Sequence, residues 1–181
     1  MKVLLAAALI AGAFVGRSAA ADEPAPLTAA ERRTLEEAAR HQSAGLRLAR
    51  RGELAGAETA LLRALELRRA VPCPPELLIA SHDHLASVLE RRERFPFAVR
   101  ARADSLALRE KHYGPDSPEH GIGEANLGAS YRKSGQFIES IAHYERAKAT
   151  LSKSGDTHAA RIAGIDAILA GLRAPLAEEP R

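Results

Sequence analysis

The sequence is poor in cysteine, which limits how the chain can be cross-linked. Cys73 is the only cysteine among 181 residues, so no disulfide can form within the chain. It lies in a proline-rich segment, residues 71–75, outside any helical pattern. Two interpretations stay open: an intermolecular disulfide or reactive thiol, and a small apolar linker residue. Neither involves a bond within the chain.

Common catalytic and metal-binding motifs are also absent. The sequence has no Gly-x-Ser-x-Gly elbow, no phosphate-binding loop and no dinucleotide fingerprint, so we expect no enzyme activity and no cofactor. A metal site needs three or four converging ligands, yet His82 and His84 would point about 200° apart around a helix. His41 is the equivalent of His82 one repeat earlier. A metal-dependent or enzyme-accessory role for these histidines is therefore the weakest interpretation.

The only long apolar run lies at the N-terminus and is too short to span a bilayer. Lys2 gives a positive start, residues 3–15 are apolar, and Ala19-Ala20-Ala21 offers the small residues that a signal peptidase needs. We expect residues 1–21 to be a signal peptide and the mature chain to begin at Asp22. This leader predicts a periplasmic or secreted protein of bacterial origin.

The mature chain carries almost no net charge. Loss of Lys2 and Arg17 leaves 24 basic residues against 23 acidic ones, a formal charge of +1. Bulk charge therefore gives no reason to expect nucleic acid or another polyanion as a partner. No apolar run long enough to span a membrane occurs after the leader, so we expect no membrane insertion of the mature chain.

What the sequence does have is one pattern that occurs three times. The pairs Ala44-Gly45, Leu85-Ala86 and Leu127-Gly128 are 41 and 42 residues apart, and the apolar positions around them recur at the same spacing. A period of this length, with apolar residues at helical spacing on both sides of a turn, marks stacked two-helix units. The sequence predicts an all-α fold, an α-α superhelix of about three helix-turn-helix repeats plus a C-terminal capping helix.

Small residues and turn formers set the expected boundaries. Gly45, Ala86 and Gly128 predict close approach of two helices, and Gly52 and Gly135 predict the left-handed conformation that ends a helix. We expect an N-terminal linker at residues 22–30 and a repeat domain at residues 31–172. The predicted units are 31–71, 75–113 and 117–153, followed by a capping helix at 156–172 and a tail at 173–181.

The third unit carries a recognisable motif. Asn126-Leu127-Gly128-x-x-Tyr131-x-x-x-Gly135-x-Phe137, continued by Ile141, Tyr144 and Ala147, resembles the tetratricopeptide repeat. The spacing is longer than the usual repeat of about 34 residues and is similar to the long variety in kinesin light chains. The first two units depart from the motif, with Leu48 and Leu89 in place of Tyr131 and with Glu93 in place of Gly52 and Gly135. The resemblance implies a surface that binds another polypeptide.

A polar pattern repeats with the fold. The cations Arg50, Arg91 and Lys133 are equivalent, and seven residues earlier, almost two helical turns, lie Ser43, His84 and Asn126. In the resembled family the first helices line the inner surface, where Asn side chains hold a peptide backbone and Lys or Arg side chains hold carboxylates. These six residues are the predicted peptide-binding groove. The competing interpretation is that the cations only solvate an exposed helix.

Two functions follow from these observations. The first is a non-catalytic scaffold or adaptor in the cell envelope that binds an acidic or C-terminal segment of a partner protein in its concave groove. The second is a structural subunit of an envelope assembly whose main contact is with another copy of itself, as a homo-oligomer. A basic, polar groove favours the first, and an exposed apolar end favours the second.

Overall fold

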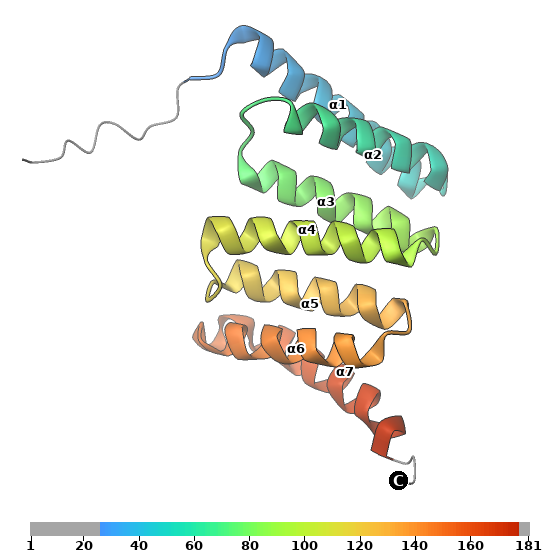
Figure 1. Ribbon diagram of the computed structural model, residues 1–181, viewed down its shortest axis with the longest axis vertical. Helices are drawn as coiled ribbons and strands as arrows, with labels where there is room; N and C mark the ends of the chain where they lie inside the picture. The colour runs from blue at the N-terminus through green and yellow to red at the C-terminus, as the bar shows by residue number, and fades with distance from the viewer. Residues whose placement is uncertain (1–25, 178–181) are drawn as a thin grey trace, which may run out of the picture.

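Helices make up almost all of the part of the chain that the structure describes. The computed structural model describes residues 26–177, and no strand occurs among them (Figure 1). The predicted signal peptide lies outside these residues. The elements are α1 (Ala29–Arg50), α2 (Leu54–Arg69), α3 (Pro75–Arg91), α4 (Phe95–Tyr113), α5 (Pro118–Lys133), α6 (Phe137–Ser152), the 3-10 turn η2 (Gly155–His158) and α7 (Ala159–Ala177).

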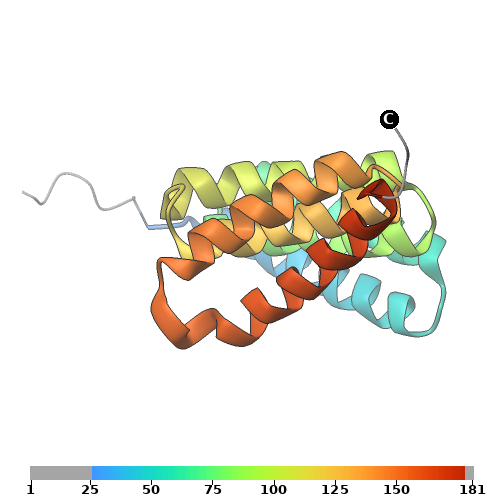
Figure 2. The same ribbon diagram turned by 90° about the horizontal axis from the view of Figure 1, so that it is seen from below.

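The helices form one stack in chain order. Each helix packs against the one that follows it, and α1–α2, α3–α4 and α5–α6 are the closest pairs. Figure 2 shows α7 running obliquely across the end of the stack. The predicted all-α superhelix is confirmed. We call α1, α3, α5 and α7 the first helices and α2, α4 and α6 the second helices.

Small residues bring the helices of a pair together. A Cβ atom added to Gly45 would lie 2.9 Å from Cγ of Leu61, and one added to Gly128 would lie 3.3 Å from the carbonyl oxygen of Ser140. The hydroxyl of Ser140 donates a 2.9 Å hydrogen bond to the carbonyl oxygen of Gly128. The predicted close approach at these glycines is confirmed, because no larger side chain fits there without displacement.

The same turn joins the two helices of each pair. Gly52, Glu93 and Gly135 all have positive φ, at 83°, 58° and 78°. The next N–H donates back to the carbonyl five residues earlier in each case: Glu53 to Leu48, Arg94 to Leu89 and Gln136 to Tyr131, at 2.9, 2.9 and 3.0 Å. These are Schellman-type helix ends. The predicted left-handed conformation of Gly52 and Gly135 is confirmed.

Two helix starts differ from the sequence-based bounds. Helix α1 begins at Ala29, within the predicted linker, because Thr28 and Glu31 form a capping box that satisfies the first free N–H groups. Helix α7 begins at Ala159 and extends to Ala177, whereas the capping helix was predicted at residues 156–172. Asp156 and Thr157 lie in the 3-10 turn before it. Ser117, the first residue of the predicted third unit, caps α5 through a 3.1 Å hydrogen bond from the N–H of His120.

The apolar core has two parts with ionised groups between them. One part lies between α1, α2, α3 and α4 around Leu61, Leu65 and Leu89, and the other lies between α5, α6 and α7 around Tyr144 and Leu151. Between these parts, ion pairs connect α3 with α4 and α5. This polar layer includes part of the predicted groove.

Candidate functional site

The three predicted cations occupy equivalent places at the ends of the first helices. Arg50, Arg91 and Lys133 are the last residues of α1, α3 and α5, and all three are exposed. The predicted register is therefore correct. Their contacts within the stack decide which of them are available to a partner.

Two of the cations connect one repeat to the next. Nη1 of Arg91 donates a 2.7 Å hydrogen bond to the carbonyl oxygen of Ala49, near the end of α1. Nζ of Lys133 forms an ion pair with Glu90 near the end of α3. Ala49 and Glu90 are themselves 41 residues apart, so the two contacts are equivalent. Within residues 26–177, no repeat precedes the one that contains Arg50, and no ion pair involves its side chain.

Glu90 is the acidic centre of this layer. Its side chain is only 6% exposed and accepts from Oγ of Ser130 at 2.6 Å, from Lys133, and from Nη2 of Arg102 at 3.5 Å. Burial alone would raise the pKa of Glu90, but the hydrogen bonds from Lys133 and Ser130 and the charge of Arg102 outweigh it and lower the pKa. Lys133 therefore has a structural role beside the predicted binding role, which stays a prediction.

The other three predicted residues lie in different environments. Ser43 is exposed on α1. His84 is half-buried on α3, and its Nδ1 has no hydrogen-bond partner in the described chain. Burial lowers the pKa of His84, and the charges of Arg68 and Arg102 lower it further, so the imidazole is neutral at pH 7. Asn126 on α5 is half-buried and lines a cavity.

This cavity lies between α5, α6, η2 and α7 and has a volume of about 630 Å³. We call it the α5–α7 cavity. Asn126 lines it together with polar residues that α6, η2 and α7 supply, and none of the other five predicted residues does. The polar lining residues besides Asn126 are Tyr144, Thr157, His158 and Arg161. The apolar part of the wall includes Ala125, Ala129, Ile165 and Ile168.

Both polar and apolar groups line the wall of the α5–α7 cavity. Arg161 is exposed on α7 and has no ion pair or hydrogen bond from its side chain within the described residues. Tyr144 is 3% exposed, and burial raises the pKa of its phenol, which therefore stays neutral. Asn126 can both donate and accept. The cavity thus offers a free cation and an amide beside an apolar surface.

Sequence reasoning missed the residues of η2 and α7 that line the cavity. Leu169-Ala170 lies 42 residues after Leu127-Gly128, and Leu169 is 4% exposed where Leu127 is 3% exposed. Helix α7 therefore keeps the register of a first helix, and this spacing was the signal that could have identified Arg161. The prediction treated the helix as a cap only.

The remaining candidate sites have simpler structures. Cys73 is half-buried in the α2–α3 connection, and burial raises the pKa of its thiol. Within residues 26–177, no three His, Cys, Asp or Glu side chains are grouped so that they could hold a metal ion. The described helices also include none with the length and apolar content needed to cross a bilayer.

Comparisons with known proteins agree with the arrangement of the helices. Residues 76–153 match the family model of the tetratricopeptide repeat. No curated protein matches the sequence. Among solved structures, the crystal structure of BtubC (BKLC) from P. vanneervenii is similar, with a TM-score of 0.62 and 19% sequence identity over 83% of this chain and 68% of that chain.

The family match covers the second and third predicted units, and the structural likeness extends the same fold over most of the chain. The matched residues contain the three features that join the repeats: the small residues at Ala86 and Gly128, the turns at Glu93 and Gly135, and the inter-repeat contact of Lys133 with Glu90. Residues 76–153 are therefore tetratricopeptide repeats, and the other described helices share the same α-α fold.

Proposed function

We propose that the protein is a non-catalytic adaptor that binds a segment of a partner polypeptide in the α5–α7 cavity. Tetratricopeptide repeats generally mediate protein–protein interactions. The observation that carries the proposal is the open cavity of about 630 Å³ on α5 and α7, where Asn126 and Arg161 stand beside an apolar wall.

The chemistry of the cavity suits an extended segment with an acidic group. Arg161 can bind a carboxylate with two parallel hydrogen bonds, which are among the stronger ones in proteins. The amide of Asn126 can pair with a backbone N–H and C=O. Ile165 and Ile168 offer an apolar surface to one neighbouring side chain. An acidic side chain or a C-terminal carboxylate next to an apolar residue is therefore the expected ligand.

The cell envelope is the proposed location. The support comes from the sequence alone: Lys2, the apolar residues 3–15 and Ala19-Ala20-Ala21 have the form of a secretory leader. An adaptor in that compartment would hold its partner within a larger assembly.

Affinity capture from the native envelope fraction tests the proposal. The mature protein and an Asn126→Ala, Arg161→Glu double variant serve as baits, and bound proteins are identified by mass spectrometry. We expect a partner that the parent captures and the double variant loses. Arg33→Glu is the control, because Arg33 is exposed near the start of α1 and does not line the cavity. Equal capture of the same proteins by all three baits would contradict the proposal.

A further inference from the structure

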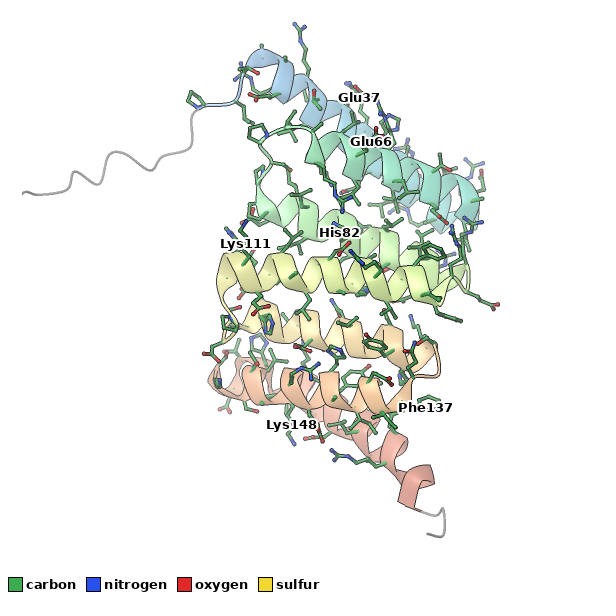
Figure 3. All side chains as sticks on the ribbon, in the orientation of Figure 1. Glu37, Glu66, His82, Lys111, Phe137 and Lys148 are labelled. Carbon is green, nitrogen blue, oxygen red and sulfur yellow. The ribbon has the colours of Figure 1, made fainter. Side chains whose placement is uncertain are left out.

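A second groove lies along α2 and continues between α2, α3 and α4. Two adjoining cavities of about 580 and 310 Å³ form it, and Arg69 lines both. Figure 3 shows Glu66 on α2, His82 on α3 and Lys111 near the end of α4 around this region. We call it the α2–α4 groove, with Leu62, Leu65, Leu78 and Leu108 as its larger apolar residues and Arg63, Arg69 and Lys111 as its basic ones.

The apolar residues of the groove are partly open to solvent. Leu62 is 47% exposed on α2, and Leu78 and Leu108 are half-buried on α3 and α4. Exposed apolar surface rimmed by polar residues is typical of interaction sites. A groove between two helices suits the apolar side of a third helix, whose side chains at positions i, i+3, i+4 and i+7 enter it.

The uncompensated charge of the groove is positive. Its two carboxylates are already paired, Glu66 with Arg63 at 3.0 Å and Asp104 with Arg100 at 3.1 Å. Lys111 is exposed and forms no ion pair with any residue in the range 26–177. The groove therefore complements an acidic ligand.

His82 adds an unsatisfied donor at the floor of the groove. It is 3% exposed, and Nη2 of Arg69 lies 3.2 Å from its Nε2. Because an arginine side chain can only donate, Nε2 is the acceptor and the proton of the neutral ring is on Nδ1. Oδ2 of Asp104 is 3.9 Å from Nδ1, beyond hydrogen-bond distance, so this N–H has no partner in the described part of the chain.

The equivalent position in the next repeat is occupied by an ion-paired side chain. Glu124 corresponds to His82, and its two carboxylate oxygens bind Nδ1 of His143 at 2.6 Å and Nε of Arg146 at 3.0 Å. Arg146 in turn corresponds to Asp104. The α4–α6 interval thus has paired charges at the position where the α2–α4 interval has the unpaired Nδ1–H of His82.

We propose that the α2–α4 groove binds an acidic amphipathic helix of a partner protein. The apolar side chains of the partner helix contact Leu62, Leu78 and Leu108. The carboxylates of the partner helix bind Arg69 and Lys111. This site is separate from the α5–α7 cavity, so the protein can hold two polypeptides at once.

A designed peptide tests the proposal without knowledge of the natural partner. The probe is a 14-residue helix with Leu on one face and Glu beside it, and its twin has Gln in place of every Glu. In ¹H–¹⁵N NMR spectra of the mature protein, we expect the Glu peptide to shift the backbone resonances of residues 59–69 and 104–111 and the His82 Nδ1 resonance. The Gln twin should bind at least about fivefold more weakly, which corresponds to the loss of one or two exposed ion pairs.

Surface variants locate the site. Leu62→Glu and Lys111→Glu should each weaken binding at least about fivefold. Ile138→Glu should leave it unchanged, because Ile138 is 74% exposed on α6 and does not line the groove. Circular dichroism checks that each variant is folded. Equal affinity of the two peptides, resonance shifts confined to α5–α7, or no binding at millimolar peptide would each overturn the proposal. The outcome is independent of the capture experiment with the α5–α7 variants.

Discussion

Glu93 is the least favourable residue in the three equivalent turns. It has a φ of 58° where the other two turns have glycine. The left-handed conformation costs an L-residue with a Cβ roughly 1–2 kcal/mol, whereas glycine adopts it freely. The turn keeps its hydrogen bonds, including the 2.9 Å bond from Arg94 to Leu89, so the packing on both sides holds Glu93 in this conformation.

Glu93→Gly should therefore stabilise the protein by about 1 kcal/mol, the relief of strain less the extra entropy of glycine in the unfolded chain. For a chain of this size the midpoint of thermal unfolding should rise by about 2–4 °C. Gly135→Ala is the matched control and should lower the midpoint, because Gly135 has a φ of 78°. A lower midpoint for Glu93→Gly would show that the carboxylate contributes more than the strain costs.

The two histidines of α3 make stability depend on pH. Burial is the main cause that lowers the pKa of both imidazoles. The charge of Arg69 lowers the pKa of His82 further, whereas the charge of Asp83 offsets part of the shift of His84. The unfolded chain thus binds protons more readily than the folded one between the ordinary value of 6.5 and the lowered values. Their contribution to stability is complete above about pH 6.5 and is lost as the pH falls below it.

We expect the thermal midpoint to drop between pH 7.5 and pH 5.5, and a His82→Gln, His84→Gln double variant to show a smaller drop. This range stays above the region where Glu90 and Glu124 titrate, since hydrogen bonds and nearby cations hold the pKa of both below 4.5 despite their burial. An equal drop in parent and variant would contradict the assignment to these histidines.

At the scale of the helices, close packing within each pair depends on small residues. Gly128 faces the carbonyl oxygen of Ser140 and the ring of Tyr144, both 3.3 Å from a Cβ placed at this position. Ser140 is fully buried and its hydroxyl bonds back to Gly128. The backbone of α6 must move if a side chain is added on α5 here.

Gly128→Leu should destabilise the protein by about 3 kcal/mol, at the upper end of the usual cost of overpacking. Far-ultraviolet circular dichroism during heating should show a helical spectrum with a midpoint about 6–12 °C lower. Gly171→Leu is the control, because a Cβ at that position of α7 has no atom within 4 Å. Similar midpoints for the two variants would show that the α5–α6 contact is looser than described.

The sequence was a good guide to the helices and to their order, because small residues and turn formers act locally. Ala44-Gly45 and Leu127-Gly128 marked the contacts within pairs, and Gly52 and Gly135 marked the turns. The ends of α1 and α7 were less predictable, since a capping box at Thr28 and a 3-10 turn before Ala159 decide them. Such choices depend on a few competing hydrogen bonds.

The candidate site was harder to predict than the helices. The register of Arg91 and Lys133 was visible in the sequence, but the groups they contact, the carbonyl of Ala49 and the carboxylate of Glu90, lie about 42 residues away in the preceding repeat. A periodic pattern shows which residues are equivalent and not which of them pair across an interface. For the same reason Asn126 was identified without its neighbour Arg161 on α7.

At the scale of the whole molecule, Glu90 couples the second repeat to the third. It lies between the two apolar clusters and accepts from Arg102 on α4 and from Ser130 and Lys133 on α5. In a linear array, stability depends on such contacts between neighbours. Loss of the carboxylate charge should therefore affect cooperativity as well as stability.

Glu90→Gln should lower the free energy of unfolding by about 3 kcal/mol, as expected when one partner of a buried ionic group is removed. The urea transition should also become shallower, because the two halves then unfold less cooperatively. Glu66→Gln is the control, since Glu66 pairs with Arg63 in an exposed position and should change stability by under about 0.5 kcal/mol. Equal effects of the two substitutions would contradict a coupling role for Glu90.

A partner segment that occupies the α5–α7 cavity must cover backbone amides in the cavity wall. Hydrogen–deuterium exchange of the mature protein, alone and with the partner recovered from the envelope fraction, tests this occupancy most directly. Amides in the cavity wall exchange more slowly when a bound segment orders and covers them. We predict added protection at residues 125–129 and 157–168, with little change in α1. Protection confined to α1 and α2, or none anywhere in the stack, would contradict it.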